Sequence, residues 1–105
     1  MAKRNRQLAR CGLAGTGVEW HAGQLVSALE AKNRVAVVHR VKYLDQALRE
    51  LSRECKVKIQ QDERIGTGRV IGEMQKGDWI AATSAVHGVT IRARVALQEA
   101  AHGQR

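Results

Sequence analysis

The sequence predicts a small, mostly α-helical domain with a central amphipathic helix, and three observations favour this class. Neither glycine nor proline occurs between Gly23 and Gly66, so no helix breaker interrupts that stretch. Apolar residues within the same stretch recur at helical spacing. The C-terminal third is rich in alanine and holds residues that commonly cap helices. With 105 residues, the chain has room for a single core.

Residues 1–17 are predicted to form a flexible basic arm, and residues 18–105 a single small domain. The cations of the arm precede every acidic residue of the chain: Lys3, Arg4, Arg6 and Arg10. Three glycines follow, and glycines at that spacing weaken regular structure. One interpretation is an arm that lies against phosphates or enters a DNA groove. The other is a frayed, solvated terminus.

A helix is predicted over residues 36–56. Its apolar side chains alternate steps of four and three residues, which places them on one face: Val37, Val41, Leu44, Leu48, Leu51 and Cys55. That face suits the core of a bundle better than the seam of a coiled-coil dimer, because about two to three heptads are short for an autonomous coiled coil. The periodicity extends weakly back to Leu25. Asn33 therefore either ends a first helix or lies within one longer helix.

The outer face of this helix carries a cationic stripe, which consists of Lys42, Arg49, Arg53 and Lys56. Asp45 interrupts the stripe and precedes Arg49 by four residues, the spacing of a favourable helical ion pair. The stripe could follow a phosphate backbone. Ordinary solvated helix faces have a similar composition.

The C-terminal third fits two structures. In the first, Asp78 caps one helix, Gly88 ends it and Thr90 caps a second helix. In the second, residues 77–97 form a β-hairpin with its turn at His87-Gly88, and the fold class becomes α+β. The caps and the alanines favour the two helices.

These two helices would have the outline of a helix-turn-helix. Arg92 and Arg94 would lie near the start of the second helix, at the edge of a DNA major groove. Arginine suits that place, because its planar guanidinium can bind guanine as well as phosphate. The match is loose, since His87 and Arg94 fall where core side chains are usual.

No residue pattern predicts an enzyme, a metal site or a cofactor. The histidines and cysteines are scattered and do not form the local pairs of structural zinc sites. The glycines after residue 65 match neither a dinucleotide nor a P-loop fingerprint. Cys11 and Cys55 do not make a disulfide framework, so we expect reduced thiols in a cytoplasmic protein. No apolar run is long enough to span a membrane.

Charge gives the strongest indication of a partner. The chain holds 18 Lys and Arg residues against 10 Asp and Glu residues, for a formal net charge of +8. Such an excess attracts polyanions. We therefore expect a DNA-binding regulator or accessory factor, which contacts duplex DNA through the arm, the stripe and the two C-terminal arginines. A platform of exposed aromatic rings for single strands is less expected, because the chain has only two Trp and one Tyr.

Two other classes of function remain open. One is an adaptor or inhibitor of a phage or another mobile element, which would dock its basic surface on an acidic host protein or a protein–nucleic-acid complex. The other is a structural subunit of an assembly. A core of small aliphatic side chains buries little area per residue, so a homodimer would add stability.

Overall fold

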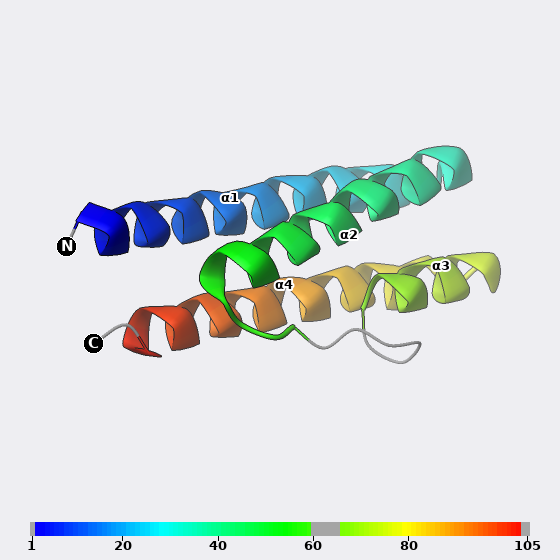
Figure 1. The fold of residues 1–105 in the computed structure, drawn as a ribbon. Helices are drawn as coiled ribbons and strands as arrows, with labels where there is room; N and C mark the ends of the chain where they lie inside the picture. Colours follow the sequence, from blue (N-terminus) through cyan, green and yellow to red (C-terminus); the bar gives the residue numbers. More distant parts are fainter. Residues whose placement is uncertain (1, 60–65, 104–105) are drawn as a thin grey trace.

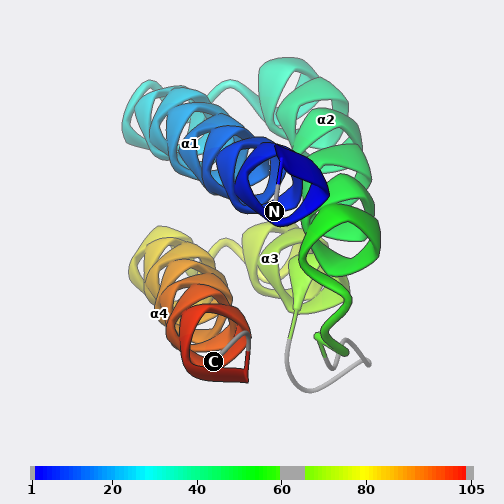
Figure 2. The ribbon, with the colours of Figure 1, turned by 60° about the vertical axis from the view of Figure 1, so that its left-hand side comes forward.

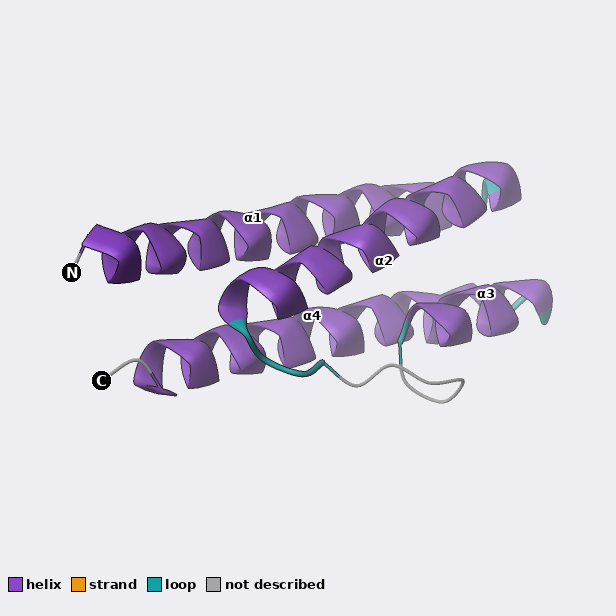
Figure 3. Cartoon of the chain, in the orientation of Figure 1, coloured by secondary structure: helices purple, strands orange, loops and turns teal. Residues whose placement is uncertain are grey.

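The computed structural model describes residues 2–59 and 66–103, and this part of the chain is all-helical, without strands (Figure 3). Its helices are α1 (Ala2–Glu30), α2 (Arg34–Cys55), α3 (Thr67–Gln75) and α4 (Trp79–Gly103). The mostly helical class is therefore confirmed. The α+β alternative is wrong, because α4 covers all but the first two residues of the expected hairpin at 77–97.

The helices run alternately in opposite directions and form two layers (Figure 1). α1 lies beside α2 in one layer, and α3 lies beside α4 in the other (Figure 2). α1 also packs on α4, so the first and last helices are neighbours. With nine residues, α3 is far shorter than its neighbours, of which the shortest has 22. It therefore covers only part of α4.

The turn between α1 and α2 settles the role of Asn33. Lys32 adopts the left-handed backbone conformation with φ 54°, and its N–H donates to the Leu29 carbonyl over 3.0 Å. The Asn33 side chain then accepts a hydrogen bond from the Ala36 N–H over 3.1 Å, as an N-cap does. Asn33 thus separates two helices.

The core lies between the two layers and is aliphatic. α2 contributes all the apolar side chains that the spacing places on one face, and Ala47 with them. Five leucines are fully buried: Leu25, Leu29, Leu44, Leu48 and Leu51. Burying one such side chain stabilises the fold by about 1.5–3 kcal/mol, so this cluster from α1 and α2 contributes strongly to the core.

The structure places residues 2–17 in the first half of α1, where the sequence predicts a flexible arm. Three side chains of this segment and the next turn enter the core: Cys11, Ala14 and Val18. Gly15 faces Leu97 of α4, and a Cβ at Gly15 would lie 2.5 Å from Leu97 Cδ1. This glycine lets the two helices approach each other, which compensates for its weak helix propensity.

The expected pair of C-terminal helices is a single helix, so the helix-turn-helix outlined in the C-terminal third does not form between Trp79 and Gly103. Asp78 does cap α4, since its carboxylate accepts the Ala81 N–H over 2.9 Å. Gly88 and Thr90 lie inside the helix. The Thr90 hydroxyl donates to the Val86 carbonyl over 3.1 Å and caps nothing. A helical glycine costs about 1 kcal/mol, less than the gain from one continuous buried stripe through Ala82, Val86, Val89 and Ala93.

A disulfide joins Cys11 of α1 to Cys55 at the end of α2, with an S–S distance of 2.04 Å. The expectation of reduced thiols is therefore wrong. Spacing alone could not reveal this bond, because the cysteines are 44 residues apart and the antiparallel turn of the chain brings them together. Among the helices described, none has both the length and the apolar character that crossing a membrane requires.

Candidate nucleic-acid interface

One end of the bundle gathers cations from two distant parts of the chain. α1 begins at the end of the molecule where α2 finishes, and the Cys11–Cys55 disulfide ties the two helices there (Figure 1). Four exposed basic side chains from these segments define what we call the basic end: Arg6, Arg10, Arg53 and Lys56. Lys3 and Arg4 belong to the same helical segment of α1.

Arg53 of the basic end forms only a loose ion pair, although Glu50 and Glu54 line a groove beside Arg10. Arg53 Nε lies 3.9 Å from Glu54 Oε1, and the Arg53 side chain is 74% exposed against 27% for Glu54. The guanidinium therefore projects into solvent beyond its partner. An ion pair of this kind is worth about 0–1 kcal/mol, so Arg53 can exchange Glu54 for a phosphate at little cost.

The opposite end, which we call the turn end, is balanced in charge. Its cations are Lys32, Arg34 and Lys76, and its acids are Glu30, Glu73 and Asp78. Lys76 Nζ lies 3.5 Å from Glu73 Oε1. The Arg34 guanidinium lies over the Trp79 ring at 5.4 Å. The cationic excess of the molecule is therefore concentrated away from the turn end.

The side chains of the predicted stripe on α2 are exposed, but only some of them form ion pairs. Arg49 Nη2 lies 2.9 Å from Asp45 Oδ2, the helical pair that the spacing predicts. Lys56 lies just beyond the helix as its left-handed C-cap. Among the described residues, no ion pair involves Lys42 or Lys56. The stripe thus leads along α2 toward the basic end.

The structure does not bring Arg92 and Arg94 together. Two residues apart on one continuous helix, their side chains leave α4 in directions about 200° apart. Arg94 Nε lies 2.8 Å from Glu19 Oε1 of α1. Arg92 lies on the other flank and lines a hollow beside the start of α3 with Ser84. Arg92 and Arg94 therefore do not lie side by side near the start of a second helix, where the sequence predicts them.

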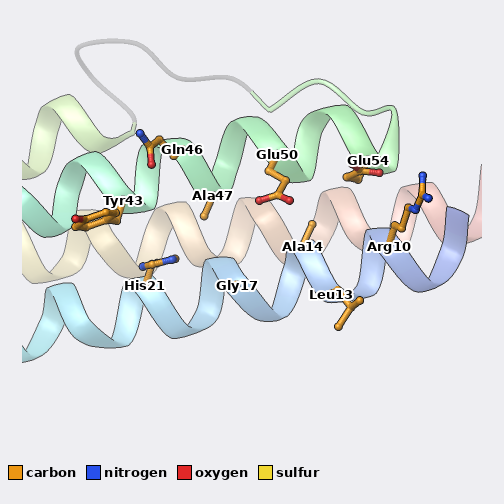
Figure 4. Close-up of a pocket in the computed structure, with 10 residues that line it drawn as sticks. All are labelled: Arg10, Leu13, Ala14, Gly17, His21, Tyr43, Gln46, Ala47, Glu50 and Glu54. Carbon is orange, nitrogen blue, oxygen red and sulfur yellow. The ribbon is translucent and has the colours of Figure 1, made fainter. Parts of the chain in front are cut away.

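A groove along the outer side of α1 and α2 is the feature that sequence reasoning missed (Figure 4). It starts near Arg10 and Glu54 and reaches His21 and Tyr43. A second hollow of about 540 Å³ continues from these two rings and adds Trp20, His39 and Arg40. The only hint in the sequence was the neighbouring pair Trp20-His21, because helical periodicity does not say which aromatic side chains stay outside the core.

No metal centre accompanies these surfaces, because no group of His, Cys, Asp and Glu among the residues described could hold an ion. Comparison with protein-family models, curated proteins and solved structures found no match to this chain. The candidate interface therefore stands on its own geometry and charge.

Proposed function

We propose that this protein binds nucleic acid through the basic end, as an accessory factor without a base-reading helix. The observation that carries the proposal is the gathering of Arg6, Arg10, Arg53 and Lys56 at one end, while the turn end is balanced. Arginine and lysine that neutralise phosphates release counterions, which provides sequence-independent affinity. The separation of Arg92 from Arg94 argues against specific reading of a duplex through this pair.

A matched pair of triple variants tests the proposal. Arg6→Gln/Arg53→Gln/Lys56→Gln removes three cations from the basic end. Lys32→Gln/Arg34→Gln/Lys76→Gln removes three cations from the turn end. Each set contains one lysine with a left-handed backbone conformation, Lys56 or Lys32, and one cation that is paired with a glutamate, Arg53 or Lys76. The two variants have the same net charge, so a difference between them reports local contacts and not long-range attraction.

Affinity is measured by fluorescence anisotropy with labelled duplex and single-stranded oligonucleotides between about 50 and 200 mM salt. We expect the slope of log affinity against log salt to become shallower by about two to three units for the basic-end variant, since each phosphate contact contributes about 0.7–0.9. The turn-end variant should keep the slope of the unchanged protein. Equal slopes for the two variants, or no binding of any oligonucleotide at low salt, would contradict the proposal.

A further inference from the structure

The outer hollow between α1 and α2 carries an inference that rests on the proposed function and deepens it. We propose that Trp20 and Tyr43 stack on unpaired nucleobases, so that the nucleic acid bound by this protein is single-stranded. We call the hollow the ring groove and define it by the residues that line it: Trp20, His21, Ala36, His39, Arg40 and Tyr43.

Exposure of the rings is the first observation. Trp20 is 57% exposed and Tyr43 is 49% exposed, although the chain has only three Trp and Tyr residues to place. Large aromatic side chains provide much of the burial in an ordinary core. Here the core is built without Trp20 and Tyr43, and both flank the same hollow on the outside of the molecule.

The arrangement of the rings is the second observation. His21 stacks on Tyr43 with 5.8 Å between ring centroids and 14° between ring planes. Trp20 meets His21 edge to face, at 4.9 Å and 83°. The histidine thus holds the two larger rings in place from the α1 side. A base that enters the hollow meets rings that already contact a neighbouring ring, which lowers the entropy cost of stacking.

The charge of the lining favours an anionic occupant. The lining of the ring groove contains Arg40 and two histidines and no carboxylate. The hollow shares His21 and Tyr43 with the neighbouring groove, whose other end lies at Arg10 of the basic end (Figure 4). Glu50 and Glu54 line that intervening groove and repel phosphates from it. A strand in the ring groove would place a phosphate at Arg40 and its bases against the rings, and its path to Arg10 would run outside the two carboxylates.

Stacking chemistry distinguishes a single strand from a duplex. Bases in a duplex are already stacked and paired, and extruding one costs a few kcal/mol. Unpaired bases offer a free face to any aromatic ring, whatever their identity. The basic end alone would bind both forms, whereas the ring groove favours the form with free bases.

Trp20 can report its own contact with bases. The chain has two tryptophans, so Trp79→Phe leaves Trp20 as the only one. This variant is titrated with an oligothymidylate, an abasic oligonucleotide of equal length and a duplex of equal length. We expect the oligothymidylate to quench Trp20 emission. The abasic strand should bind through its phosphates without quenching, and the duplex should quench little.

Ring variants then test the energetic role of the groove. Trp20→Leu and Tyr43→Leu should each weaken binding of the oligothymidylate about tenfold or more, in the range measured for base stacking, and leave binding of the abasic strand unchanged. Tyr43→Phe keeps the ring and should keep the affinity. Ile80→Ala removes an apolar side chain that is 82% exposed in the other layer and serves as the matched control.

The outcomes separate this inference from the proposed function. If each ring variant binds the oligothymidylate as tightly as it binds the abasic strand, the ring groove takes no base. If the basic-end variant also loses affinity for both strands, the proposed function is still supported. If neither strand binds, both proposals fail. If Trp20 emission instead changes with protein concentration alone and the sedimenting mass doubles, a second copy of the chain occupies the groove and the inference is overturned.

Discussion

Two glycines of α1, Gly12 and Gly15, differ in what a side chain at their position would contact. Gly15 of α1 faces Leu97 of α4, and a Cβ there would come within 2.5 Å of Leu97 Cδ1. A Cβ at Gly12, one turn earlier on the same helix, would meet only open space. The two glycines therefore have the same helix propensity, but only Gly15 lies against a neighbouring helix. The sequence alone does not distinguish them.

Gly15→Val should destabilise the fold by about 1–3 kcal/mol, because overpacking forces Leu97 or the α1 backbone to shift. Gly12→Val should be neutral or slightly stabilising, since valine exceeds glycine in helix propensity. Urea unfolding followed by circular dichroism measures both. Leu97→Ala in the Gly15→Val background should recover part of the loss. Equal effects of the two valines would show that α1 and α4 do not approach at Gly15.

At the scale of the element, periodicity predicts α2 within about two residues of its observed bounds. Val and Leu that recur every three to four residues all fall on one face only if the segment is helical. The sequence predicts an end at Gly88 and a new start at Thr90, whereas α4 continues through both. Both residues are local signals of an end, and the buried stripe from Ala82 to Ala93 outweighs them. Such a tertiary contribution cannot be read from local sequence.

Gly88→Ala distinguishes the continuous helix from a turn. A Cβ at this position would meet only Arg92 Nη1, at an ordinary contact distance of 3.6 Å. Alanine should therefore stabilise the protein by about 0.5–1 kcal/mol, the usual difference in a helix interior. A glycine with positive φ in a turn would give the opposite sign. Thermal unfolding of the variant and the unchanged protein measures that sign.

At the scale of the whole molecule, the candidate interface depends on contacts between distant segments. The cations of residues 3–10 and of residues 53–56 are visible in the sequence as separate runs. Only the antiparallel packing of α1 on α2 places them at one end. The ring groove is harder still to predict, because the sequence does not show that Trp20 of α1 and Tyr43 of α2 both stay outside the core and meet at one hollow.

The Cys11–Cys55 bond should stabilise this arrangement by about 2–4 kcal/mol, because it closes a loop of 44 residues and so restricts the unfolded chain. Urea unfolding of the oxidised protein should therefore shift to lower denaturant when dithiothreitol is added. The Cys11→Ala/Cys55→Ala variant, which has no bond to reduce, should unfold at the same urea concentration with and without dithiothreitol. If reduction leaves the midpoint of the unchanged protein in place, α1 and α2 are held at the basic end by packing of the apolar core alone.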